Sequence, residues 1–162
     1  MIFISLGTTL IPFPRLIESS LEILSNTRQE IHIQHGNTPV ESQSKSIITT
    51  PYISNSEMIE EIRNANMIIC AAGEATVFQI LQNARYKPIL FPRLKKFHEH
   101  VDDQQLSIAQ YFEKKDKAYC ALDSEQLQQI MNEYPVLEKN NHLRKETNKK
   151  IIDKLIRFTE NL

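Results

Sequence analysis

The chain has 162 residues, a formal net charge of −1 and five histidines. Hydrophobic residues make up 41% of it and charged residues 24%, as in ordinary soluble globular domains. This length allows one domain with a real core, and a charge near zero creates no overall field that would attract nucleic acid or anionic lipid. Any binding of a phosphate group must therefore depend on a local arrangement of residues.

The N-terminus and the two cysteines carry no targeting or metal signal. Residues Ile2–Leu6 follow Met1 directly, form too short an apolar run for a signal peptide and lack its basic leading segment. No run approaches the roughly 18 apolar residues of a transmembrane helix. Cys70 and Cys120 each end an apolar run without metal-ligand spacing, which indicates free thiols. We expect a cytoplasmic protein.

Short apolar runs alternate with segments of helical periodicity. Six runs predict strands, in chain order Ile2–Leu6, Ile31–Gln34, Ile47–Thr50, Met67–Cys70, Pro88–Phe91 and Lys117–Leu122. Helices are predicted to begin at Pro12 or Pro14, at Asn55 or Ser56, at Thr76, at Asp102 or Asp103, and at Asp123 or Ser124. This alternation predicts an α/β domain, a Rossmann-like doubly wound parallel sheet over residues 1–135. Residues 136–162 are expected to form a C-terminal helical extension, with a basic helix over Asn141–Leu162.

Three loops are predicted at the carboxyl ends of strands, Gly7-Thr8-Thr9, Ala72–Thr76 and Phe91–Gln105. Parallel strands end at one edge of a sheet, and open α/β sheets bind their ligands there. The second loop opens a helix with a small residue, a Gly and a hydroxyl, so its N–H groups and dipole suit a phosphate. A purely structural interpretation, in which Glu74 or Thr76 only serves the helix start, stays open.

The loop Phe91–Gln105 holds two Lys, one Arg, two His, three acids and two Gln. If Asp102 or Asp103 caps the helix that follows, its buried face consists of Val101, Ile108, Ala109 and Phe112. Gln105 falls on that same face. A Gln there needs partners, which can be backbone groups or the hydroxyls of a bound sugar.

Several other kinds of site are disfavoured. His98 and His100 stand two apart and would point to opposite sides of an extended segment, so we expect no metal site. No Gly-x-Ser-x-Gly elbow indicates a hydrolase. No Gly-rich dinucleotide fingerprint or P-loop Lys occurs, which argues against an NAD enzyme and a nucleotide triphosphatase.

Taken together and in order, the three loops resemble the glycosyltransferase family 28 C-terminal domain, over residues 2 to about 130. The closest likeness is to its stand-alone Alg13-like and PssE-like subunits, MurG-related halves of GT-B enzymes. The resemblance implies a UDP-sugar held against these loops, with no cofactor. By position, Gly7 and Thr8 with Gly73, Glu74, Ala75 and Thr76 would surround the uracil, ribose and diphosphate. Gln104 and Gln105 match the family pair that contacts donor-sugar hydroxyls, while Arg93, Glu99, His100 and Asp103 lie in the same loop.

Four positions depart from this resemblance. Ala71 and Ala72 replace the Ser-His or similar pair that often precedes the turn Gly. Gln79 stands where MurG-type relatives place a Glu that grips the ribose, and an amide bonds a hydroxyl without charge assistance. His98 stands where PssE-like sequences usually carry a Gly.

The resemblance also implies a partner. GT-B enzymes place the acceptor site, and often the catalytic base, on an N-terminal domain, here expected as a membrane-anchored Alg14- or PssD-like subunit acting on a polyprenyl-diphosphate-linked acceptor. The partner would recruit this chain to the inner face of the membrane. The activity implied is inverting hexosyl transfer in exopolysaccharide or capsule synthesis. A non-catalytic enhancer subunit and another nucleotide-sugar-binding α/β module remain alternatives.

Overall fold

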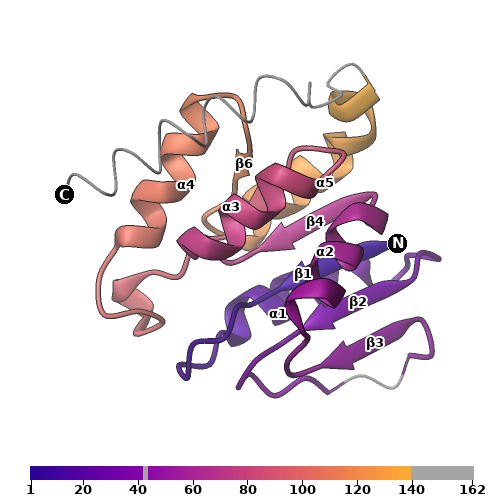
Figure 1. Ribbon diagram of the computed structural model, residues 1–162, viewed down its shortest axis with the longest axis horizontal. Helices are drawn as coiled ribbons and strands as arrows, with labels where there is room; N and C mark the ends of the chain where they lie inside the picture. Colours follow the sequence, from indigo (N-terminus) through magenta and orange to yellow (C-terminus); the bar gives the residue numbers. More distant parts are fainter. Residues whose placement is uncertain (42–43, 140–162) are drawn as a thin grey trace.

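The computed structural model describes residues 1–41 and 44–139. Within them the chain forms a parallel sheet with helices on both faces (Figure 1). The strands are β1 (Ile2–Ser5), β2 (Ile31–Gln34), β3 (Ile47–Thr50), β4 (Met67–Cys70), β5 (Ile89–Leu90) and β6 (Tyr119–Cys120). The helices are α1 (Pro14–Leu24), α2 (Asn55–Asn64), α3 (Glu74–Asn83), the short 3₁₀ turn η1 (Lys95–Phe97), α4 (Gln104–Lys114) and α5 (Ser124–Lys139).

The strand order is β3-β2-β1-β4-β5-β6, and every neighbouring pair is parallel. This is the doubly wound order, in which the chain reverses direction across the sheet between β1 and β4. The predicted Rossmann-like α/β fold is therefore confirmed. The loops after β1 and β4 flank the reversal point, because Ser5 lies beside Cys70 in the register of the two strands.

Alternate residues of the strands face two separate cores. Ile2, Ile4 and Ile69 pack with α1 and α5 on one face. Phe3, Ile68 and Leu90 belong to the other, which α2, α3 and α4 cover. Strands β1, β4 and β5 are buried on both faces and read as nearly continuous apolar runs, which is why they could be located from sequence.

Several local boundaries differ from the sequence predictions. Helix α2 is capped by Ser54, one or two residues before the predicted caps Asn55 and Ser56. Ser54 and Glu57 form a reciprocal capping box, in which the hydroxyl and the carboxylate each accept a backbone N–H. Helix α3 begins at Glu74, not Thr76. The predicted burial of Val101 is wrong: it is 73% exposed, because it lies in the loop before α4 and outside the helix.

The last helix continues past Pro135 to Lys139. The predicted division between residues 135 and 136 thus falls within α5 and stays a prediction. Of the predicted extension 136–162, with its helix over 141–162, residues 140–162 lie outside the described part. No helix in the described part is long and apolar enough to cross a membrane.

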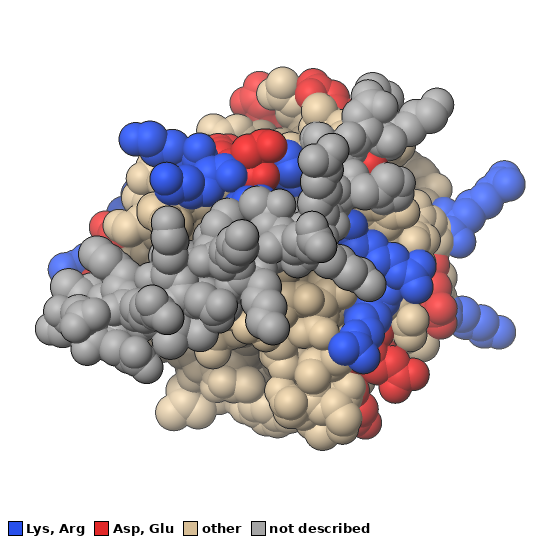
Figure 2. Space-filling model, turned by 45° about the horizontal axis from the view of Figure 1, so that its top comes forward, with Lys and Arg blue, Asp and Glu red and all other residues tan. Residues whose placement is uncertain are grey.

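The surface carries charges of both signs. Lys and Arg side chains alternate with Asp and Glu around the upper part of the face in Figure 2, and the lower part of the visible described surface is largely uncharged. This agrees with the net charge of −1. The visible charges form no broad area of one sign.

One buried amide ties the loops after β1 and β3 together. Gln34, 4% exposed, accepts hydrogen bonds from the Ser5 hydroxyl (2.9 Å) and the Gly7 N–H (3.2 Å). Its Nε2 donates to the carbonyls of Gly7 and Pro51, both at 2.9 Å. Gly36 lies so close that a Cβ there would stand 2.8 Å from the Gly7 oxygen. The turn at Gly7, with φ +77°, is therefore fixed by its neighbours.

A second polar cluster joins β2 to α2. His32 Nδ1 lies 2.9 Å from an oxygen of Glu61, and its Nε2 lies 3.3 Å from Glu30. Burial acts to lower the pKa of His32, but the two carboxylates outweigh it and the pKa is raised above 6.5. Because the folded pKa exceeds the unfolded one, protonated His32 stabilises the fold most below about pH 6.5, and this contribution is lost as the pH rises through the folded pKa.

We predict that His32→Gln removes this pH dependence. The difference in unfolding free energy between wild type and variant should be larger near pH ~6 than near pH ~8, as measured by urea unfolding. A difference that stays constant, or that grows with pH, would contradict the assignment.

Candidate functional site

The three predicted loops follow three adjacent strands, β1, β4 and β5, and lie along one carboxyl rim of the sheet. The first contains Gly7, the second leads through Gly73 into α3, and the third connects β5 to α4. In Figure 1 the third loop extends away from the strands at the left of the view. The fold thus brings the segments together, and the side chains divide into those used within the protein and those left free.

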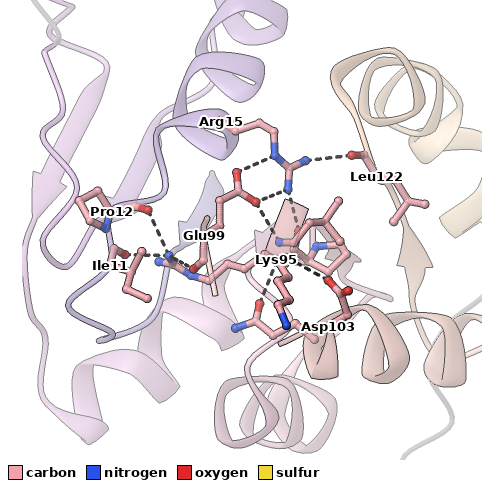
Figure 3. Close-up of polar contacts among 11 residues, drawn as sticks. Ile11, Pro12, Arg15, Lys95, Glu99, Asp103 and Leu122 are labelled. Carbon is pink, nitrogen blue, oxygen red and sulfur yellow. Dashed lines mark hydrogen bonds and ion pairs between the residues drawn. The ribbon is translucent and has the colours of Figure 1, made fainter. Parts of the chain in front are cut away.

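Arg93 is used within the protein. It is 2% exposed, and its guanidinium donates to the carbonyls of Leu6 (3.2 Å), Ile11 (2.7 Å), Pro12 (3.3 Å) and Glu99 (3.3 Å). It also lies over the ring of Phe13, 4.5 Å from the centroid. Burial lowers the pKa of Arg93 to about 10 and the charge of Glu99 acts against this, so the side chain stays cationic at neutral pH. Arg93 ties the β1 loop to the β5 loop (Figure 3).

Glu99 is also used within the protein. Its carboxylate is 6% exposed and accepts a bidentate pair from Arg15, at 2.8 and 2.7 Å, together with the N–H of Leu94 at 3.0 Å. Arg15 further donates to the carbonyls of Pro92 and Leu122 (Figure 3). The described contacts occupy both oxygens of the carboxylate, so Glu99 has a structural role here.

Two further residues of the third loop hold its turns. Asp103 accepts the N–H of Lys95 at 2.9 Å through its side chain. His100 Nδ1 lies 2.9 Å from Asp102, whose same oxygen accepts the N–H of Gln104 at 3.0 Å. That backbone bond, and then the neighbouring His100, lowers the pKa of Asp102. These contacts shape the approach to α4.

The residue His98 adopts the left-handed conformation, with φ 56° and ψ 27°. Glycine adopts this conformation without steric cost, whereas other residues are strained in it. The backbone conformation at this position would therefore suit a Gly.

Gln105 is fixed at one end and open at the other. It is 8% exposed, and its side-chain oxygen accepts the N–H of Arg93 at 3.1 Å. Its amide nitrogen makes no hydrogen bond within the described residues and is not among their enclosed, unpaired side-chain atoms. The side chain can donate to a ligand. Its neighbour Gln104 is exposed, and its side chain has no hydrogen-bonding partner within residues 1–41 and 44–139.

The start of α3 is open. Gly73 occupies the N-cap with no side-chain cap, and a Cβ built on it would meet nothing within 4 Å. Glu74 and Ala75 are exposed, and neither Glu74 nor Thr76 makes a side-chain hydrogen bond within the described residues. Unoccupied N–H groups at a helix start attract anions.

The turn after β1 completes this half of the rim. Thr8 is exposed, and its hydroxyl is likewise without a described partner. Gly7 fixes the turn and offers no side chain. Gln79, one turn into α3, donates its amide to Asn55 at the start of α2. Its expected contact with a ribose stays a prediction.

Three residues of this rim carry no clear functional signal in the sequence. Arg15 and Gln34 hold the loops in place, and Tyr52 is a half-exposed aromatic side chain whose hydroxyl donates to Asn37. The signal for Tyr52 was an aromatic residue two positions after the end of strand β3. In the described part of the chain no group of three or more His, Cys, Asp or Glu could hold a metal ion.

Comparisons with known proteins agree with this architecture. A model of the glycosyltransferase family 28 C-terminal domain matches residues 1–159. A solved structure described as the glycotransferase of kitacinnamycin superposes with a TM-score of 0.61 at 12% identity, covering 96% of this chain and 38% of that one. No curated protein matches the sequence.

These findings define the fold class: a Rossmann-like, doubly wound parallel sheet that superposes on a solved glycosyltransferase. The chain belongs to the glycosyltransferase family 28 C-terminal domain family, since the match spans nearly its whole length. It covers little more than a third of the solved glycosyltransferase.

We predict that Arg93→Lys destabilises the protein by about 2–4 kcal/mol, because a single ammonium group cannot satisfy four carbonyls and the unpaired ones stay buried. The measurement is the free energy of unfolding in urea, with the exposed Arg85→Lys as control. If both variants stay within about 0.5 kcal/mol of wild type, Arg93 does not hold the rim.

Proposed function

We propose that this chain is the donor-binding half of a two-component glycosyltransferase that transfers a hexosyl group from a UDP-sugar, with inversion, to a polyprenyl-diphosphate-linked acceptor. The observation that carries the proposal is the set of free polar groups at the sheet's reversal point. Family membership supports glycosyl transfer, and the UDP-sugar, the acceptor and the role in exopolysaccharide or capsule synthesis are our proposal.

The nucleotide would lie over the loops after β1 and β4. The open N-terminus of α3 supplies N–H donors and a partial positive charge for the diphosphate, and Thr8 supplies a hydroxyl beside it. Tyr52 offers an exposed ring on which a base can stack. It stands three residues before Asn55, which contacts α3 through Gln79. Aromatic, hydroxyl and helix start are therefore available along one edge.

The sugar would lie toward the start of α4. Gln105 has its oxygen committed to the Arg93 N–H, so its free NH₂ must donate to an acceptor atom of the ligand, such as a hydroxyl oxygen. Gln104 can both donate and accept. Two amides at one helix start suit a polyol better than a second phosphate, because they bring no positive charge.

The chemistry follows from this arrangement. Departure of UDP leaves negative charge on the diphosphate, and a helix N-terminus fixed nearby stabilises that charge without having to reorganise. Under this proposal the chain needs no cofactor or metal. Among the described residues, each of the three acids of the third loop, Glu99, Asp102 and Asp103, accepts a hydrogen bond from within the protein. We propose that the catalytic base lies on the partner, as the resemblance to GT-B enzymes implies.

The partner is proposed to be a membrane-anchored, acceptor-binding subunit of the Alg14 or PssD kind, which brings this chain to the inner face of the membrane. The chain covers 38% of the solved glycosyltransferase, and we propose that a separate subunit provides the acceptor-binding part, as the resemblance to Alg13-like and PssE-like subunits implies.

We predict that the purified chain binds a UDP-sugar, and that Gln105→Ala weakens this binding about fivefold through the loss of one hydrogen bond. The assay is calorimetry or ligand-observed NMR with a panel of UDP-glucose, UDP-galactose and UDP-N-acetylglucosamine. Gln110→Ala, an exposed amide on the same helix, is the matched control and should bind like wild type.

If the chain binds none of the three UDP-sugars at millimolar concentration, the donor-binding proposal is refuted. Equal affinity of Gln105→Ala and wild type would remove that residue from the site while leaving the proposal intact.

A further inference from the structure

Arg15 connects parts of the chain that lie far apart in sequence. It belongs to the first turn of α1, yet its Nε and Nη2 donate to Glu99, 84 residues away, at 2.8 and 2.7 Å. Nη2 also donates to the Pro92 carbonyl at 2.8 Å, and Nη1 to the Leu122 carbonyl at 2.9 Å. One guanidinium thereby joins α1 to the loops after β5 and β6 (Figure 3).

This ion pair is sheltered from water. The side chains of Arg15 and Glu99 are 19% and 6% exposed, and the guanidinium lies 4.3 Å from the ring centroid of Phe91 and 5.0 Å from that of Phe97. A planar, forked donor stacked between rings loses less entropy in binding a carboxylate than a flexible surface pair does. The Arg15–Glu99 ion pair can therefore hold the loop after β5 in one position.

The loop that Arg15 holds is the one that carries the two amides. Glu99 passes the constraint to the Leu94 N–H at 3.0 Å, and Arg93, the residue before it, fixes the oxygen of Gln105. By contrast, Arg15 has no described bond to the start of α3. The start of α4 and the start of α3 are thus held by different contacts.

We propose that Arg15 is a positioning residue, which sets where Gln104 and Gln105 stand relative to the open start of α3 without touching the ligand. The inference rests on the proposed function. Loss of Arg15 would weaken binding of the sugar and leave binding of the nucleotide diphosphate intact. A general effect on folding would weaken both.

The test compares UDP with the best-binding UDP-sugar of the panel. In Arg15→Lys the charge remains, but one nitrogen cannot replace the fork and reach two carbonyls as well. We expect the UDP-sugar to bind about fivefold more weakly or worse, and UDP to stay within about twofold of wild type. Glu99→Gln, which keeps the shape of the acceptor and can still accept the Leu94 N–H, should show the same pattern in milder form.

Tyr134→Phe provides a control for destabilisation alone. Its hydroxyl donates to the Lys87 carbonyl at 2.7 Å, at the amino end of β5 and away from the rim. We expect this variant to bind UDP and the UDP-sugar with wild-type affinities.

The outcomes separate the two proposals. If wild type binds the UDP-sugar and both rim variants lose UDP and UDP-sugar affinity equally, or lose neither, the positioning role is overturned and the proposed function stands. If wild type binds neither ligand, the proposed function fails, and the positioning role fails with it. Should Arg15→Lys fail to fold, Glu99→Gln decides the question by the same criterion.

Discussion

The carboxyl rim of the sheet depends on the guanidinium of Arg93, whose positive charge lies almost fully out of water. Burying a charge is costly unless its donors find acceptors. Here Nη1 and Nη2 donate to the carbonyls of Leu6, Ile11 and Pro12 in one loop and of Glu99 in the other, and the Phe13 ring lies against the group. The buried Nε has no partner within the described residues. Since the loops must stay in place to satisfy the charge, the cost of burial and the shape of the rim are coupled.

Around this contact the polar residues divide into two sets. Glu99 and Asp103 are consumed by internal donors, and Gln34 uses all four hydrogen bonds of its amide in the same way. Thr8, Glu74, Thr76, Gln104 and the amide nitrogen of Gln105 are left free within the described residues. A site built in this way is preorganised. The internally bonded residues fix the loops when the protein folds, so the ligand does not have to order the loops that carry the free groups.

The sequence allowed much of the fold to be predicted, because strands covered on both faces are short apolar runs and the alternation with helices leaves few topologies. The location of the rim followed from the strand ends. The roles of Arg93 and Glu99 within the protein could not be predicted, since their partners are backbone carbonyls and an arginine 84 positions away. The role of Gln34 was missed because its partners are mainly backbone groups. The burial of Val101 was predicted wrongly because periodicity cannot distinguish one additional helical turn from a loop. The family was anticipated from the ordered loops together and not from any single motif.

The central claim is that a UDP-sugar lies across the loops after β1, β4 and β5. It is tested most directly by titrating the ¹⁵N-labelled chain with UDP-glucose and mapping the amide shift changes. The account predicts the largest changes at Thr8, at Gly73 to Thr76 and at the side-chain amide of Gln105. It is contradicted if the changes centre on the hollow of about 310 Å³ at the opposite end of the sheet, lined by residues such as Leu21, Leu24 and Ile47, or if none appear.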